Sequence, residues 1–314
     1  MSLVKVWLSS QFDMKDLGEA NFILGIKLLR DRKKKMLGLS QAGYIDKILE
    51  RFSMQNSKKG LLPFRHGVPL SDDQMPETQE EENMMRQVPF ASTVGSLMYA
   101  MLCTRPEICY SVGMVNRYQS NLGPKHWQAV KHILKYLQRT RDYMLVYRCE
   151  DLIPIGYTNS DFQSDLDFRK STSGCVFTLG GGAISWWSIK QSCITDSTME
   201  AKYVAACEAA KEAVWFKKFL SNLGVIRMKQ VLITLFCDNS GAVAQSNDPM
   251  NHKKGKHIDR KYHIIQDIVA RGDVGVAKVE SANNLVDPFT KTLPQRTFES
   301  HLEGMGVRLV HNSL

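Results

Sequence analysis

The strongest constraint on the fold of this chain is a change of pattern near residue 150. Beyond it, short apolar segments of strand length alternate with turns and with segments of helical periodicity. The first three apolar segments are joined tightly enough to be antiparallel neighbours, whereas the later ones follow helices and cross over. This order predicts an α/β domain with a mixed five-stranded sheet and flanking helices. Strands are predicted at 152–157, 175–179, 183–187, 231–237 and 274–279, and helices at 198–223, 241–245 and 259–270.

The residues before 150 have a mostly helical pattern. Residues 20–39 are typical of a hairpin with a basic tip, and apolar residues recur at helical spacing over 44–52. The acidic segment 71–83 is expected to be a solvated loop or a weak helix. Helical periodicity then extends over 89–142, with Pro106 and Pro124 at the starts of helices.

The composition is that of a globular protein and favours a polyanionic partner. The 314 residues are 43% hydrophobic, which suffices for two modest domains. No apolar run is long enough to cross a bilayer and no signal peptide is evident, so we expect a soluble, intracellular chain. The formal net charge of +9 fits a nucleic-acid partner, although many basic proteins bind none.

One predicted helix carries a basic face that has two explanations. The face is equally well interpreted as a solvated surface or as a surface that follows a phosphate backbone. Its residues are Lys125, Lys131, Lys135, Arg139 and Arg141.

Cysteines and histidines give no sign of a metal cluster or a disulfide framework. The seven cysteines are scattered and include no Cys-x-x-Cys pair, so we expect reduced core residues. His252, His257 and His263 have no cysteine nearby, which favours a surface loop followed by a helix over a zinc site.

Polar residues that follow the predicted strands suggest a second kind of metal site. Asn159 and Asp161 follow the first strand, Glu200 lies in the first turn of the long helix, and Asp238 and Asp287 come later. Carboxylates that converge at one edge of a sheet favour a hard divalent cation, and a pair of Mg²⁺ ions can hydrolyse a phosphodiester.

Each of these residues also has a structural explanation. Glu200 completes a capping box with Ser197, Asp238 can cap the following helix, and Asp287 can be a loop carboxylate. Taken singly, the residues favour these structural roles over a nuclease site.

Ordered motifs add a family resemblance that covers nearly the whole chain. The chain resembles the C-terminal part of a copia-type LTR retrotransposon Pol polyprotein, in which the end of the reverse transcriptase precedes an RNase H domain. In the second part the motifs are residues 156–161, 169–174, 183–186, 197–203, 237–242, 256–263 and 287–291, and in the first part they are 14–18, 39–41, 94–99 and 104–106.

The resemblance implies a domain organisation and an activity. Residues 1–150 would be a thumb- or connection-like remnant of the reverse transcriptase, 151–293 an RNase H-like domain, and 294–314 a C-terminal helical tail. The inherited chemistry is endonucleolytic hydrolysis of the RNA strand of RNA–DNA hybrids with Mg²⁺ or Mn²⁺. Partners would be the hybrid and the rest of the polyprotein, and the location would be the cytoplasm, in virus-like particles, and the nucleus.

The resemblance also assigns residues to roles. Glu200, Asp238 and Asp287 take the places of three catalytic metal ligands, and Asn159 takes the place of the fourth, an aspartate in the family. Candidate nucleic-acid contacts are Arg169, Lys170, Lys256 and His257.

Three departures from the family pattern lower the expected activity. Asn159 removes one charge from the metal site, and Asp161 lies about 6–7 Å further along a continuing strand. Lys202 replaces an acidic residue, and Asp196 stands where the family has an apolar one. We therefore expect weakened metal binding and weak or absent cleavage.

The sequence leaves two other hypotheses open. Without the family's Tyr-x-Asp-Asp motif, the chain is not expected to synthesise DNA alone. A non-catalytic nucleic-acid-binding remnant of a decayed element is the main alternative to a nuclease, and a poorly folding decayed reading frame is a third hypothesis.

Overall fold

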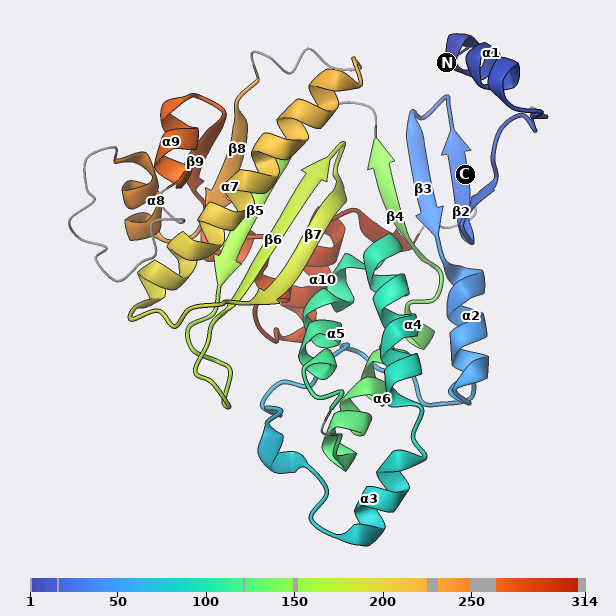
Figure 1. Cartoon of the computed structure of the whole chain (residues 1–314), viewed down its shortest axis with the longest axis vertical. Helices are drawn as coiled ribbons and strands as arrows, with labels where there is room; N and C mark the ends of the chain where they lie inside the picture. The colour runs from blue at the N-terminus through green and yellow to red at the C-terminus, as the bar shows by residue number, and fades with distance from the viewer. Residues whose placement is uncertain are drawn as a thin grey trace.

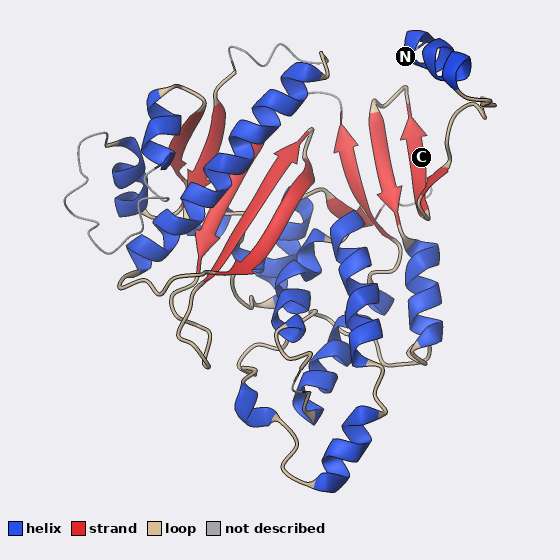
Figure 2. Cartoon of the chain, in the orientation of Figure 1, coloured by secondary structure: helices blue, strands red, loops and turns tan. Residues whose placement is uncertain are grey.

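Two five-stranded sheets organise the chain (Figure 1, Figure 2). The computed structural model describes residues 2–15, 17–120, 122–148, 152–224, 231–248 and 264–309, without the side chains of residues 2–4. We call the two sheets the first and the second sheet, in chain order.

The second sheet confirms the predicted mixed α/β domain. Its strand order is β7-β6-β5-β8-β9. The first three strands in the chain are antiparallel to one another, and β8 and β9 continue the sheet parallel to β5. The strands are β5 (Ile155–Ser160), β6 (Thr172–Leu179), β7 (Gly182–Lys190), β8 (Ile233–Cys237) and β9 (Val274–Lys278).

Helices cover one face of the second sheet. The long helix α7 (Thr198–Asn222) lies across this face, with α8 (Ser240–Asn247) and α9 (Ile264–Ala270) beside it (Figure 1). The predicted start of α9 at residue 259 lies outside the described residues. Alanines on α7 allow close packing onto the sheet, because a small side chain lets a helix backbone approach its neighbour.

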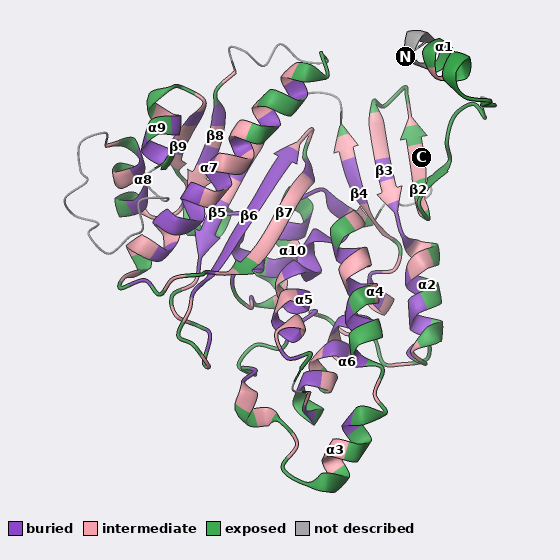
Figure 3. Cartoon of the chain, in the orientation of Figure 1, coloured by how far each residue is buried: buried purple, intermediate pink, exposed green. Residues whose placement is uncertain are grey.

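Strand β6 is buried on both faces (Figure 3). Cys175 and Phe177 belong to the core under α7, and Val176 between them belongs to a second core shared with the first part of the chain. A strand covered on both sides needs apolar residues at successive positions, which accounts for the three successive apolar residues Cys175, Val176 and Phe177.

The first sheet is antiparallel and has the order β1-β2-β3-β4-β10. The predicted hairpin is β2 paired with β3, with residues 32–35 at its tip. The sequence pattern did not reveal the other strands. The five strands are β1 (Phe22–Ile23), β2 (Ile26–Asp31), β3 (Met36–Ser40), β4 (Tyr143–Arg148) and β10 (Val307–Leu309).

The helices of the first part agree with the sequence pattern. The amphipathic segment at 44–52 lies in α2, and the acidic segment contains a 3-10 turn, η1 (Asp72–Gln74), and the start of α3. Within the described ranges, each helix is too short or too polar to cross a bilayer. Besides η1, the helices described in this part are α1 (Ser2–Gln11), α2 (Ala42–Arg51), α3 (Gln79–Arg86), α4 (Phe90–Cys103), η2 (Pro106–Ile108), α5 (Cys109–Asn116) and α6 (Pro124–Arg139).

Two of the family motifs in this part meet in the core. The Thr104 hydroxyl donates to the Gln41 side-chain oxygen at 2.6 Å. Arg105 is completely buried, forms an ion pair with Glu107 at 2.7 Å and donates to the carbonyl of Thr140 at 3.2 Å. Buried charges need such partners, so these motif residues have a structural role.

The last described segment packs against the first part of the chain. After the 3-10 turns η5 (Ser281–Asn283) and η6 (Asp287–Phe289), helix α10 (Gln295–Gly304) contributes to the core that contains α6. Strand β10 then pairs with β4. The predicted domain boundaries at residues 150 and 293 stay predictions, but residues 295–309 lie with the first sheet, and residues 307–309 are a strand where a helical tail was predicted.

Candidate active site

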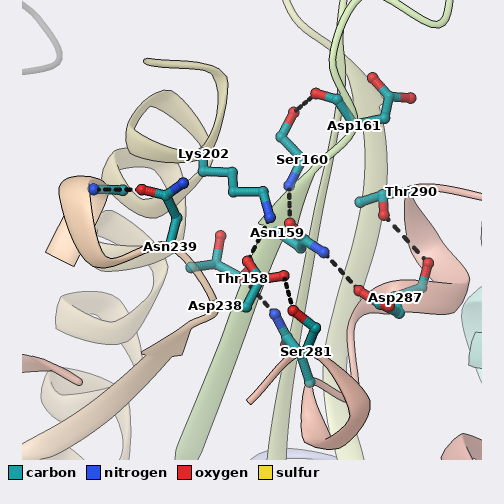
Figure 4. Close-up of polar contacts among 12 residues, drawn as sticks. Thr158, Asn159, Ser160, Asp161, Lys202, Asp238, Asn239, Ser281, Asp287 and Thr290 are labelled. Carbon is teal, nitrogen blue, oxygen red and sulfur yellow. Dashed lines mark hydrogen bonds and ion pairs between the residues drawn. The ribbon is translucent and has the colours of Figure 1, made fainter. Parts of the chain in front are cut away.

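The candidate site lies where β5 and β8 end side by side (Figure 4). Asn159 is the second-last residue of β5 rather than a residue beyond it, and Asp238 follows the last residue of β8. Asp287 begins η6, which packs on β6. Adjacent parallel strands bring their carboxyl ends to one edge of a sheet, which is where α/β folds bind ligands.

Asn159 and Asp287 are direct partners. The Asn159 amide nitrogen donates to the Asp287 carboxylate at 2.6 Å, and both residues are buried. The Asn159 side-chain oxygen accepts from the backbone N–H of Ser160 at 2.8 Å. The Asp287 carboxylate can only accept and the Ser160 N–H can only donate, so these two contacts fix which end of the Asn159 amide faces each of them.

A glycine on β6 allows this approach. A Cβ atom at Gly174 would lie 2.8 Å from the Cβ of Phe289 and 2.9 Å from a methyl carbon of Thr290. A second contact joins this segment to the sheet, because the Asn284 amide donates to the Thr158 carbonyl of β5 at 3.2 Å. The segment that carries Asp287 is therefore held against the sheet.

Asp238 and Asp287 each form an ion pair with a lysine. The Lys202 ammonium lies 2.6 Å from the Asp238 carboxylate, and both side chains are largely buried. Lys291, one helical turn after Asp287, lies 2.7 Å from its carboxylate. The Ser281 hydroxyl donates to the second oxygen of Asp238 at 3.2 Å.

Glu200 has the capping role that its spacing indicates. Its backbone N–H donates to the Ser197 hydroxyl at 3.2 Å, and its carboxylate accepts from the backbone N–H of Asp196 at 2.9 Å. These two contacts form the capping box at the start of α7. In this conformation the carboxylate is engaged by the backbone.

Asp161 fixes a loop. Its carboxylate accepts from the backbone N–H of Thr172 at 2.7 Å and from the Ser164 hydroxyl. Burial raises the pKa of this carboxyl, and these hydrogen bonds oppose the increase. Asp161 thus closes the loop between β5 and β6.

The side chains as they lie fit a divalent cation poorly. The described residues contain no group of three or more histidine, cysteine, aspartate or glutamate side chains placed to share a metal ion. The carboxylates of Asp238 and Asp287 are each paired with an ammonium group, and the Asn159 amide donates to Asp287. Mg²⁺ needs oxygen ligands and negative charge, which lysine and an amide donor do not supply.

The candidate nucleic-acid residues fall into two groups. Arg169 and Lys170 lie in the loop between β5 and β6, where Arg169 is exposed and Lys170 donates to the Ser192 carbonyl at 3.0 Å. Lys256 and His257 lie outside the described residues. The partnership of Lys291 with Asp287 was missed from sequence, although their i,i+4 spacing on a short helical segment was a usable signal.

Comparison with known sequences identifies relatives over almost the whole length. No family model matches. The chain is 45% identical over 300 residues to the retrovirus-related Pol polyprotein from transposon TNT 1-94 of Nicotiana tabacum, covering 96% of this chain and 22% of that protein. It is 31% identical over 304 residues to the corresponding protein from transposon RE1 of Arabidopsis thaliana, covering 96% and 20%. The chain thus spans about a fifth of the length of these curated relatives.

A shorter protein matches over most of its own length. An uncharacterised mitochondrial protein of Arabidopsis thaliana is 30% identical over 211 residues, which are 66% of this chain and 83% of that protein. Among solved structures, LC11-RNase H1 isolated from compost is 16% identical, with a TM-score of 0.34 and coverage of 48% of this chain and 98% of that one. A crystal structure of the same enzyme in complex with an RNA/DNA hybrid has a TM-score of 0.33 at 14% identity and covers 44% and 93%.

The sequence relatives and the strand order of the second sheet confirm the family resemblance drawn from the motifs. The chain belongs to the retrovirus-related Pol polyprotein family of copia-type transposons, and its second sheet with the flanking helices is an RNase H-type domain.

Proposed function

We propose that this RNase H-type domain binds RNA–DNA hybrids but cleaves the RNA strand much more slowly in Mg²⁺ than a domain with four free carboxylates. The observation that carries the proposal is the pair of contacts Lys202–Asp238 and Asn159–Asp287. In both contacts, a group of the chain itself binds a carboxylate oxygen that a hydrolytic metal site would need as a ligand.

Charge explains the direction of the effect. Four carboxylates within one site repel one another, and divalent cations relieve that repulsion. Here one acid is replaced by Asn159 and two others are neutralised by Lys202 and Lys291. The energy gained on binding Mg²⁺ is correspondingly smaller, and binding has to displace two lysines.

Binding of the hybrid does not need that metal. The net charge of +9 favours contacts to phosphates, and hybrid recognition relies on backbone shape and 2′-hydroxyl groups more than on bases. Arg169 and Lys170, on the loop that follows β5, are our candidates for these contacts, together with Lys256 and His257. We further propose that the remainder of a Pol polyprotein is a partner and that the chain acts in cytoplasmic virus-like particles and in the nucleus.

A metal-dependence experiment tests the proposal on the wild-type chain. A labelled RNA–DNA hybrid is titrated with protein in EDTA, in Mg²⁺ and in Mn²⁺, and RNA cleavage is followed in the same samples. We expect similar affinity in EDTA and Mg²⁺ at constant ionic strength, with an RNA strand that stays largely intact. Rapid Mg²⁺-dependent cleavage, or hybrid binding that requires the metal, would refute the proposal.

A further inference from the structure

A small cavity lies against α6, in the first part of the chain. Its volume is about 140 Å³, and none of its lining residues belongs to the candidate active site. One wall is formed by α6 residues at the i, i+3, i+4 and i+7 positions that share a helix face. These residues are Lys125, Gln128, Ala129 and His132.

The rest of the lining combines apolar side chains with a cation. Phe64 and Leu70 are buried, with 8% and 2% of their surfaces exposed. Exposed Val68 and Arg65 complete the lining. A ligand group that enters therefore meets an aromatic ring and aliphatic carbon inside and positive charge around it.

The charge around the cavity has one sign. Burial lowers the pKa of His132, and Arg65, Lys135 and Lys131 lower it further by repulsion. Among the described residues, neither these three cations nor Lys125 has a carboxylate within ion-pair distance. Such a set of cations favours an anionic ligand.

The rest of the basic face of α6 is different. Arg139 pairs with Glu299 at 2.8 Å, and Arg141 pairs with Asp46. Within the basic face of α6, the cations without a carboxylate partner among the described residues are therefore Lys125, Lys131 and Lys135. The Nε2 atom of His132 is also buried without a hydrogen-bond partner in the described part of the chain, so a ligand can satisfy it.

The size of the cavity limits what it can hold. Pockets for whole small molecules usually measure roughly 300–1,000 Å³. A cavity of about 140 Å³ suits one flat ring system, with the charged remainder of the ligand outside on the cations. A nucleotide has this division between a planar base and an anionic phosphate.

We propose that this cavity binds one nucleotide of a single-stranded nucleic acid. The base packs against Phe64 and Leu70, and the adjoining phosphate contacts Arg65, Lys125 and His132. Single-strand binding proteins combine aromatic side chains with a basic surface in the same way. The proposal concerns the first part of the chain and does not depend on the state of the RNase H-type site.

Equilibrium binding of a labelled oligothymidylate, measured by fluorescence anisotropy over a range of salt concentrations, tests this. Arg65→Gln/Lys125→Gln should weaken binding at least tenfold and reduce the slope of log K against log salt by about 1.4, since each lost phosphate contact lowers it by about 0.7. The control is Lys27→Gln/Lys218→Gln, which removes the same charge from β2 and α7. It should change affinity less than twofold, and an equal loss in both double variants would refute a localised site.

A second variant separates the contribution of the base to binding from that of the phosphate. Ala129→Leu fills the cavity and keeps every charge, so it should weaken binding about five- to tenfold with an unchanged salt slope. Unchanged affinity for Ala129→Leu would refute the base pocket.

A measurement on the wild-type chain avoids any question of misfolded variants. In an NMR titration of the histidine side chains, assigned with His132→Gln, saturating oligothymidylate should raise the pKa of His132, because a nearby phosphate favours the imidazolium. Binding of the strand with no change in the His132 pKa would contradict the proposal.

Discussion

The amide of Asn159 shows how one atom changes the character of the site. An aspartate at this position would face the buried carboxylate of Asp287, and the two would need a cation or a shared proton between them. Asn159 instead donates a hydrogen bond to Asp287. The Asp287 carboxylate, which would need a cation beside a second aspartate, thus has a hydrogen-bond donor from within the chain.

Asn159→Asp is predicted to destabilise the protein without metal and to make its stability respond to Mg²⁺. In EDTA, loss of the buried donor and repulsion from Asp287 should lower the free energy of unfolding by about 1–3 kcal/mol. Excess Mg²⁺ should recover much of this by binding the folded state. Urea unfolding in EDTA and in Mg²⁺ measures both effects.

The matched control is Asn239→Asp. Asn239 caps α8, and its side-chain oxygen accepts from the backbone N–H of Ala242 at 2.9 Å. Aspartate caps helices as well as asparagine does, so stability should change by less than about 0.5 kcal/mol with either buffer. If Mg²⁺ changed the stability of both variants equally, an acid at position 159 would not be a metal ligand.

At the scale of elements, the start of α6 depends on a neutral histidine. The His126 Nδ1 atom accepts from the backbone N–H of Gly123 at 2.9 Å, and its Nε2 atom lies 3.1 Å from the Ser71 carbonyl. A carbonyl only accepts, so Nε2 carries the proton and the ring is neutral. Burial is the main cause that lowers the pKa of His126, and the contact with Ser71 opposes it.

This arrangement predicts a loss of stability in weak acid. The folded-state pKa of His126 lies below the unfolded value of about 6.5, so the unfolded chain binds more protons as the pH falls below that value. The free energy of unfolding should therefore decrease as the pH falls from roughly 7.5 to 5.5.

His126→Gln should show a smaller decrease, measured by urea unfolding at both pH values. Some dependence should remain, because burial also lowers the pKa values of His132 and His301. A wild-type chain that is equally stable at both pH values would contradict this account.

The sequence predicts elements well where their periodicity is local. The hairpin of the first sheet, the helices over 89–142 and the succession of strands and helices after residue 150 followed from apolar spacing and turn residues. Strand β10 escaped prediction because it has three residues and pairs with β4, which is some 160 residues away in the chain. A strand this short is stabilised by pairing with a partner that is distant in the chain, and the local sequence pattern does not indicate that partner.

The sequence pattern put Asn159 and Asp238 at the ends of two strands, and the fold sets those strand ends side by side. The roles that the family motifs assign to these residues stay predictions. The lysine partners of Asp238 and Asp287 depend on side-chain directions in the folded chain. Lys202 was recognised as a departure, yet only the fold shows that it lies against Asp238.

At the scale of the whole molecule, the two parts are joined at several places. The loop after β5 contributes Asp165, which pairs with Arg117 of the first part at 3.5 Å. Asp167 of the same loop accepts from the backbone N–H of Asp72 at 3.0 Å and from the Tyr118 hydroxyl at 3.2 Å. This loop therefore adds polar contacts to the apolar core that the RNase H-type domain shares with the first part.

The C-terminal helix is expected to be essential for stability. Phe298 on α10 is buried and packs edge-to-face on Tyr136 of α6, with ring centroids 5.9 Å apart. Phe298→Ala should lower the free energy of unfolding by about 3–5 kcal/mol through lost burial and a new cavity. Arg296→Ala, an exposed neighbour on the same helix, should change it by less than about 0.5 kcal/mol. A similar small effect of both changes in urea unfolding would show that α10 is a dispensable tail.

We propose that internal amide and lysine partners, rather than a defective scaffold, suppress RNA cleavage. The most direct test compares Mg²⁺-dependent cleavage of an RNA–DNA hybrid by the wild-type chain and by Asn159→Asp/Lys202→Glu, which restores two acidic positions. Since general-base and metal effects each contribute orders of magnitude, we predict a rate increase of at least about 100-fold in the double variant. A wild-type chain that already cleaves as fast as the double variant would show that these partners do not suppress cleavage. A folded, hybrid-binding double variant that remains inactive would show that the scaffold itself is defective.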